Sequence, residues 1–257
     1  MTSAAGGQCV RDENPMANSS LAPLSFAQRR LWFLSRFEGE GISYNVPLAV
    51  RLRGQVDQAA LKLALEDVAD RHEALRTVFP EVGGVPWQQV HPGGKGEPRL
   101  EVAEVDQTRL PEAVASSVGY RFDLATELPV RAWLFVLSPL ECVLVIVFHH
   151  IAADGWSLGP LGRDLGLAYE ARCAGREPEW DPLPVQYADY ALWQRELLGD
   201  EEDQASLARE QLEFWRGVLA GLPLELVLPF DRVRPAVASF RGGRVRFGVP
   251  GAVRGAL

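Results

Sequence analysis

One apolar run with two histidines at its end constrains this chain more than any other feature. Residues 143–148 (Val-Leu-Val-Ile-Val-Phe) are continuously apolar and rich in β-branched side chains, which is typical of a buried strand. His149 and His150 follow at once, then Asp154 and Gly155, and a helical pattern of apolar residues begins just behind them. In open sheets, sites tend to form where strands end. Because side chains alternate along a strand, the two imidazoles are expected to point to opposite sides, which leaves one free to work while the other packs.

The pattern around this run predicts an α/β fold. Residues 130–137 form a second strand, and Ser138-Pro139 supplies the turn of a hairpin that leads into the apolar run. Further strands are expected at 45–53, 77–79, 87–90, 100–105 and 244–249, and helices at 25–34, 56–74, 110–120, 158–173, 185–198 and 205–220. Ser25 is expected to cap the first helix. The core is expected to include three tryptophans at helical spacing, Trp32, Trp193 and Trp215.

Charge and composition exclude several classes of function. With a net charge of −8 and a sequence pI near 5.1, the chain lacks the basic face of a nucleic-acid-binding protein. No run approaches the roughly 18 to 20 apolar residues of a membrane span. Three unpatterned cysteines, Cys9, Cys142 and Cys173, indicate a reducing cytoplasm and no metal site. Residues 1–20 are polar and are expected to form a disordered leader.

Five segments carry recognisable motifs, in the order 25–34 (SFAQRRLWFL), 71–79 (RHEALRTVF), 149–157 (HHIAADGWS), 187–194 (YADYALWQ) and 228–235 (LPFDRVRP). Together they resemble the condensation domain of nonribosomal peptide synthetases, a relative of chloramphenicol acetyltransferase. The resemblance implies an α/β fold (α+β, a two-layer sandwich) in which a mixed sheet is flanked by helices. One motif alone would be a moderate signal, whereas five ordered segments over residues 25 to 235 make a strong one.

The resemblance also implies a division into lobes. Residues 21–180 would form an N-terminal condensation lobe that carries the HHxxxDG motif. Residues 181–257 would begin a C-terminal lobe that is truncated, because the expected strand at 244–249 has no partner in the chain and leaves an open edge.

The activity implied by the resemblance is peptide (amide) bond formation in nonribosomal peptide biosynthesis, which is an acyl transfer. A donor aminoacyl or peptidyl thioester and an acceptor amine would be presented by upstream and downstream peptidyl carrier proteins, next to an adenylation domain. The chain itself is expected to bind no cofactor, since the phosphopantetheine arms belong to the partner carrier proteins. Neither nucleic acid nor a membrane is an expected partner.

Two residues are candidates for the chemistry. His150 occupies the catalytic position of the family, and an unperturbed histidine titrates near 6.5, so at neutral pH it is mostly a free base that can accept or steer the amine proton. Such assistance is worth about 10² to 10⁴ in rate. Gly155 is either an amide donor to the developing oxyanion or simply part of a tight turn.

Other residues are expected to support the site. His149 is expected to be a packed histidine at the strand end. The aspartate of the motif, Asp154, looks structural in the family and paired with an arginine, for which Arg76 is one candidate and an arginine outside this chain is another. Ser157 is expected to cap a helix, and the sequence Trp156-Ser157-Leu158 after the glycine is more typical of condensation than of epimerisation.

Three alternatives stay open at this point. An epimerisation domain carries a similar motif, and a coenzyme A-dependent acyltransferase of the same superfamily is compatible with the residues. A non-catalytic module that docks carrier proteins or tailoring enzymes is the third, although degenerate family members replace the second histidine or the final glycine, and both are present here. Segments 37–45 and 150–154 resemble the subgroup that takes a D-configured donor and an L-configured acceptor.

Overall fold

The computed structural model describes residues 21–37, 42–94, 98–223 and scattered residues between 225 and 255. The expected leader at 1–20 therefore lies outside the described residues. The chain divides into two compact units, Met1–Phe214 and Trp215–Leu257, and the elements described next belong to the first. This unit extends beyond residue 180, and where the lobes divide in a longer protein stays a prediction.

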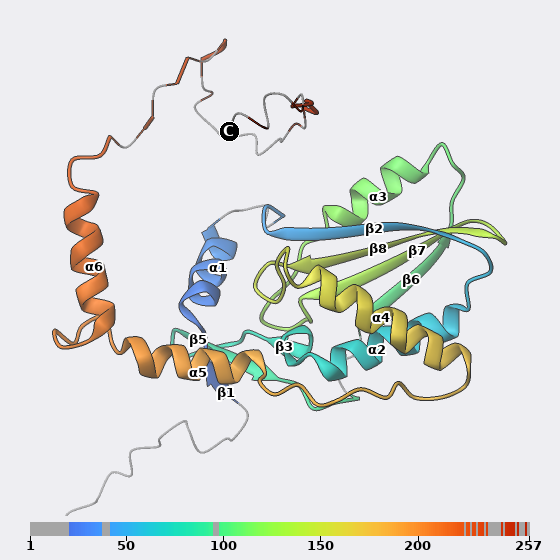
Figure 1. Ribbon diagram of the computed structural model, residues 1–257, viewed down its shortest axis with the longest axis horizontal. Helices are drawn as coiled ribbons and strands as arrows, with labels where there is room; N and C mark the ends of the chain where they lie inside the picture. The colour runs from blue at the N-terminus through green and yellow to red at the C-terminus, as the bar shows by residue number, and fades with distance from the viewer. Residues whose placement is uncertain are drawn as a thin grey trace, which may run out of the picture. The chain divides into compact units, whose positions relative to one another are not determined.

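The first unit is built around a mixed four-stranded sheet (Figure 1). Its strands lie in the order β2 (Asn45–Arg53), β8 (Glu141–His149), β7 (Val130–Ser138) and β6 (Arg99–Glu104). The β2–β8 and β7–β8 pairs are antiparallel and the β6–β7 pair is parallel. The β7–β8 hairpin follows the prediction, and β8 is an inner strand of this sheet, which explains its uninterrupted apolar sequence.

Helices cover both faces of this sheet. On one face lie α2 (Gln58–Arg71) and α4 (Leu158–Cys173), and on the other lies α3 (Leu110–Val118), as Figure 1 shows. The even-numbered residues of β8, Leu144, Ile146 and Phe148, pack into the cluster that includes α2 and α4. The odd-numbered residues, Val143, Val145 and Val147, pack into the cluster that includes α3. Strand alternation therefore decides which layer each β8 side chain enters.

A smaller sheet and two helices complete the unit. Strand β5 (Val85–Val90) pairs with β1 (Leu21–Pro23), β3 (Thr77–Val78) and β4 (Glu81–Val82), and a 3₁₀ turn, η2 (Glu73–Arg76), precedes β3. The two helices are α1 (Phe26–Phe37) and α5 (Tyr187–Leu198). The predicted cap of α1 is confirmed: the Gln28 amide donates to Ser25 Oγ at 3.1 Å, and the Ser25 amide donates to Gln28 Oε1 at 3.0 Å.

Three hydrogen bonds join the start of this unit to α5. Ser25 Oγ and Tyr187 Oη are 3.0 Å apart, the Phe26 amide donates to Gln194 Oε1 at 3.0 Å, and Arg195 Nε donates to the Leu24 carbonyl at 2.9 Å. Each bond spans more than 160 residues of sequence. The first and last parts of the unit are thus held together directly.

The predicted fold class is confirmed, and several details differ from the expectations. The short elements β1, β4 and η2 were not expected, because two to four residues are too few to show a period. The predicted strand at 244–249 is wrong for this chain, because its described residues, 245–249, form no strand. Trp32 packs against a core cluster, but Trp193 and Trp215 are 55% and 52% exposed and do not lie in the core.

Helix α6 (Leu207–Val218) begins in the first unit and ends in the second. In the described part of the chain, no helix is both long and apolar enough to cross a membrane. The same residues contain no cluster of three or more His, Cys, Asp or Glu side chains suited to hold a metal ion.

Candidate active site

The two histidines lie where β8 ends, and both are fixed through their main chains. The His149 amide donates to the Pro129 carbonyl at 2.9 Å, and the His150 amide donates to the Tyr44 carbonyl at 2.8 Å. The strand thus stays paired on both sides up to its last residue, and the chain leaves the sheet at His150. This anchoring limits how far the His150 backbone can move.

His149 is a packed histidine, with 2% of its surface exposed. Its Nδ1 accepts a hydrogen bond from the Ile151 amide at 3.1 Å, so the neutral ring carries its proton on Nε2. The ring contacts Tyr44 and Phe122, with centroids 6.4 and 6.2 Å away. Burial, and to a lesser degree the charge of His150, lower the pKa of His149 to about 4. The ring is therefore neutral at pH 7.

We predict that this buried neutral ring makes the fold sensitive to mild acid. Between pH 6.5 and about 4 the unfolded chain binds a proton on His149 that the folded chain excludes, so stability falls as the pH drops through this window. The full loss is about 3 kcal/mol. Urea unfolding at several pH values measures it.

The matched variant is His149→Asn, whose side-chain oxygen lies as many bonds from Cα as Nδ1 and keeps an acceptor for the Ile151 amide. Its stability is expected to vary much less between pH 6.5 and 4. An equally steep decline in this variant would show that other groups cause the acid sensitivity.

His150 is exposed, and alternation along the strand accounts for its separation from His149. Across the described ranges, no hydrogen bond or ion pair joins the His150 ring to another side chain. In particular, no carboxylate orients it in the manner of a Ser-His-Asp triad. The exposed imidazole is therefore not committed to a partner among the described residues.

Asp154 stabilises the start of α4 instead. Its Oδ1 accepts from the Ser157 hydroxyl at 2.7 Å and from the Ser157 amide at 2.9 Å, while the Asp154 amide donates to Ser157 Oγ at 3.1 Å. This reciprocal pattern has the form of a capping box, and it closes the turn of residues 154–157 that leads into α4. The Ser157 hydroxyl bond, followed by the Ser157 amide bond, lowers the pKa of Asp154. Ser157 occupies the N-cap position of α4, as expected, but its hydroxyl accepts from no helix amide and instead donates to the Asp154 carboxylate.

We expect Asp154→Ala to cost about 1 kcal/mol of stability, because it removes the acceptor of this capping box. Asp154→Asn keeps an acceptor oxygen and is expected to retain most of that free energy. Denaturant unfolding of the three proteins gives the comparison. An Asp154→Ala protein of unchanged stability but without activity would contradict a structural role for this carboxylate.

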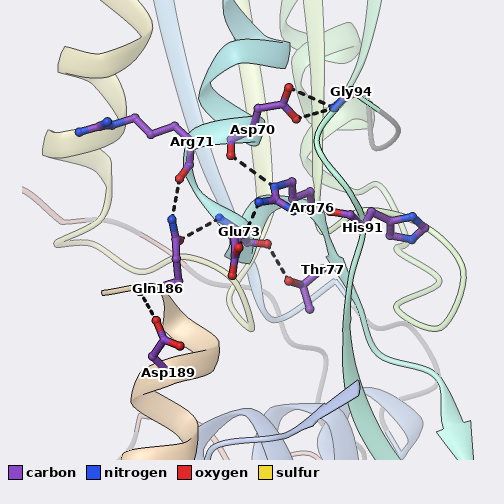
Figure 2. A network of polar contacts seen from close by, with 9 residues as sticks. All are labelled: Asp70, Arg71, Glu73, Arg76, Thr77, His91, Gly94, Gln186 and Asp189. Carbon is purple, nitrogen blue, oxygen red and sulfur yellow. Dashed lines mark hydrogen bonds and ion pairs between the residues drawn. The ribbon is translucent and has the colours of Figure 1, made fainter. Parts of the chain in front are cut away.

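Arg76 is not the partner of Asp154, which corrects that expectation. Its guanidinium donates to the Asp70 carbonyl at 3.3 Å, to Glu73 Oε1 at 3.2 Å and to the His91 carbonyl. Figure 2 shows this network. Arg76 is the last residue of η2, which follows α2 closely in the sequence. Main-chain carbonyls of the neighbouring turns are therefore nearer to its guanidinium than the carboxylate of Asp154 is. Its role is to hold the loop after β5 against α2.

Gly155 and Trp156 are exposed residues of the loop between β8 and α4. Gly155 does not adopt a left-handed conformation, and a Cβ atom added to it would meet nothing within 4 Å. Gly155 does lie in a tight turn, in which the Ser157 amide donates to the Asp154 carbonyl at 3.2 Å, although the backbone of this turn does not require a glycine. Trp156 is 91% exposed. Both residues belong to the loop that begins at His150 and leads into α4.

Sequence reasoning missed a cavity and one contact. A cavity of about 370 Å³ lies behind the loop, lined by Ala152, Ser157, His72, Tyr187 and Tyr190 among others. The missed contact is the Tyr44 carbonyl that holds the His150 amide. Tyr44 directly precedes a strand that was predicted correctly, but only the strand register places it at His150.

Comparison with known proteins agrees with this arrangement. A family model described as a condensation domain matches residues 18–257. A probable non-canonical nonribosomal peptide synthetase of Salinispora arenicola, CymA, is 55% identical over 241 residues, which cover 94% of this chain and 3% of that protein. A dimodular nonribosomal peptide synthase of Bacillus subtilis is 55% identical over 225 residues, which cover 88% of this chain and 10% of that protein.

A solved structure of similar fold is the X-domain of teicoplanin biosynthesis in complex with OxyB. The TM-score is 0.77 and the identity 43%, and the match covers 94% of this chain and 51% of that chain. The chain thus spans a small part of the two synthetases and about half of the solved chain. With the motifs, the mixed sheet and the histidine pair at the end of β8, these matches show that the chain belongs to the condensation-domain family.

Proposed function

We propose that this chain provides the histidine-bearing part of a condensation domain, which joins two carrier-bound substrates through an amide bond. The observation that carries the proposal is the exposed His150 imidazole at the end of β8, in a member of the condensation-domain family. Its neighbour His149 is buried and neutral at pH 7, which leaves a single imidazole for the reaction.

In the proposed reaction, the amine nitrogen of the acceptor attacks the thioester carbonyl carbon of the donor. A carbon–nitrogen bond forms, the carbon–sulfur bond breaks, and the departing sulfur leaves as a thiol. The nitrogen must lose one proton and the sulfur must gain one, so no further reactant is needed. We assign to His150 the acceptance of the amine proton and its return toward the sulfur. The Gly155 amide is our candidate donor to the carbonyl oxygen as negative charge develops there.

The partners follow from this chemistry. Two peptidyl carrier proteins would bring the thioester and the amine on phosphopantetheine arms, and an adenylation domain would load them. The chain itself would need no resident cofactor. Because adenylation consumes ATP, we also place the reaction in the cytoplasm.

A second candidate function is recruitment without chemistry. It is favoured by the 43% identity to an X-domain whose solved structure is a complex with OxyB. In that case the exposed surface around His150 and Trp156 would bind a partner protein, and His150 would be dispensable. The condensation activity therefore requires the His150 side chain, whereas recruitment does not.

The test supplies the full-length protein with one carrier loaded with a donor aminoacyl thioester and a second carrier loaded with an acceptor. We expect mass spectrometry to find the dipeptide on the acceptor carrier. Binding of carriers with no dipeptide would support recruitment. Inversion of a residue on a single carrier would identify epimerisation, and transfer from a coenzyme A thioester alone would identify a coenzyme A-dependent acyltransferase.

The same assay tests the stereochemical subgroup. From the resemblance of segments 37–45 and 150–154 we propose a D-configured donor and an L-configured acceptor. Matched D- and L-aminoacyl donors on the upstream carrier are compared with one L-acceptor. Faster transfer of the L-donor would reject this assignment and leave the amide-forming activity standing.

A further inference from the structure

Asn45 lies beside the histidine pair in the sheet. It is the first residue of β2 and pairs directly with His149, the last residue of β8. Directly paired residues of antiparallel strands place their side chains on the same face, with Cβ atoms about 5 Å apart. That face is the one covered by α3, into which Val145 and Val147 also point. Asn45 and His149 are thus neighbours on the α3 side of the sheet.

The Asn45 amide group ties the end of α3 to this strand. Its Nδ2 donates to the Val118 and Tyr120 carbonyls, both at 2.8 Å. Val118 is the last residue of α3, so these carbonyls belong to the helix end, where no later helix amide reaches them. Asn45, a residue of β2, therefore caps the C-terminal end of α3, a helix that is distant from it in the sequence.

The segment held in this way covers His149. Phe122 follows the capped turn, meets Tyr120 edge-on at 5.0 Å, and meets the His149 ring edge-on at 6.2 Å. Tyr44, which directly precedes Asn45, contacts the same histidines. Its ring centroid is 6.4 Å from that of His149, and its carbonyl accepts a hydrogen bond from the His150 amide. Residues on both sides of the Asn45 link thus fix the two histidines.

We propose that Asn45 is a positioning residue: by tying the end of α3 to β2, it keeps Phe122 and Tyr44 against the His149 ring and so fixes the direction in which His150 leaves β8. The inference rests on the proposed function, since it assigns Asn45 to the geometry of the reacting imidazole. Asn45 itself touches no reacting atom.

The unequal use of the amide explains why asparagine fits this position. Both hydrogen atoms of Nδ2 are used, whereas Oδ1 is buried and accepts no hydrogen bond from any residue that the structure describes. The position therefore demands donors. Serine can supply one donor, alanine none, and aspartate would direct a carboxylate at two carbonyl oxygens. The expected order of function is Asn, then Ser, then Ala, then Asp.

The first experiment reads the imidazoles directly. The chain has four histidines, so long-range ¹H–¹⁵N spectra of the full chain resolve each ring. In the native protein we expect His149 as the Nε2–H tautomer that does not titrate above pH 5. In Asn45→Ala, Phe122 and Tyr44 are expected to pack less closely on the His149 ring. Both neutral tautomers should then be populated, and the titration midpoint of His149 should rise by about 1 pH unit or more, toward the unperturbed 6.5.

A matched control separates positioning from general stability. Gln88 is another buried amide, which donates to the Pro23 carbonyl at 2.7 Å, but it lies in the smaller sheet. Gln88→Ala is expected to lower the melting temperature and to leave the His149 and His150 signals unchanged. If Asn45→Ala lowers the melting temperature as this control does, yet leaves the His149 tautomer and titration as in the native protein, the positioning role is rejected.

A second readout uses the proposed reaction in the full-length protein. Asn45→Ala is expected to lower kcat by roughly 10- to 100-fold, with KM for the acceptor carrier within about twofold, and Asn45→Ser to recover part of the rate. An unchanged kcat overturns the proposal. The two failures are distinguishable: full activity of His150→Ala would remove the proposed function, whereas the imidazole spectra judge the role of Asn45 without any turnover.

Discussion

Replacing His150 with alanine is expected to slow amide formation by roughly 10² to 10⁴-fold and to leave the fold intact. The imidazole is exposed and joins no hydrogen bond or ion pair within the described ranges, so its removal leaves no buried group without a partner. Single-turnover transfer between two loaded carriers, measured in the full-length protein, gives the rate. Circular dichroism and a carrier-binding assay on the same samples show whether the defect is confined to the chemistry.

His91→Ala is the matched control for this experiment. His91 also lies in a loop after a strand, and only its main chain makes hydrogen bonds in the described part of the chain. Its replacement is expected to leave the transfer rate within about twofold, because surface substitutions away from special features change little. Retained turnover within tenfold in His150→Ala would remove this residue from the reaction and favour recruitment as the function.

Asp164→Ala is expected to destabilise the fold by about 3 to 5 kcal/mol. Asp164 is 3% exposed, and its Oδ2 accepts from Arg71 Nε and His72 Nε2, both at 2.9 Å. Arg71 also stacks over Trp180 at 4.9 Å and donates to the Asp181 carbonyl at 2.7 Å. The carboxylate thus joins α4 to the end of α2 and the connector before α5. Removal of the carboxylate would leave the largely buried guanidinium of Arg71 without its ion-pair partner. Chemical denaturation measures the resulting loss in the free energy of unfolding.

The exposed pair between Arg51 and Glu141 supplies the control. Their side chains are 38% and 36% exposed, and Glu141→Ala is expected to cost at most about 1 kcal/mol. Burial by itself would raise the pKa of Asp164, but the hydrogen bonds and charges of His72 and Arg71 outweigh burial and lower it. Its stabilising contribution is therefore present above pH 3.8 and is lost as the pH falls through the lower folded value. A difference between native and Asp164→Ala proteins that does not shrink in acid would contradict this assignment.

Local sequence patterns were enough to predict most of the elements. The bounds of β2 and α4 agree with the expected 45–53 and 158–173, because alternation and helical spacing are both visible within a few residues. The β7–β8 hairpin followed from its turn residues and apolar strands. The separation of His149 from His150 followed from the period of the strand alone.

Partners across the fold could not be predicted in the same way. Whether Asp154 meets an arginine or Ser157 depends on the path of one loop, although the spacing Asp-x-x-Ser could have indicated the capping box. The contact between Asn45 and the end of α3 depends on the register of strands about a hundred residues apart. Trp193 lies on a helix whose apolar face is partly exposed, and helical spacing does not reveal what covers such a face.

The bonds between Leu24, Ser25 or Phe26 and helix α5 have a consequence for biosynthesis. A ribosome adds roughly 5 to 20 residues each second. Because the α5 partners lie more than 160 positions later, α1 must wait on the order of 10 to 30 seconds after its own translation before it finds them. Throughout that interval the nascent α1 helix lacks its α5 partners and is open to chaperones and proteases, and these bonds can form only once Arg195 has left the exit tunnel.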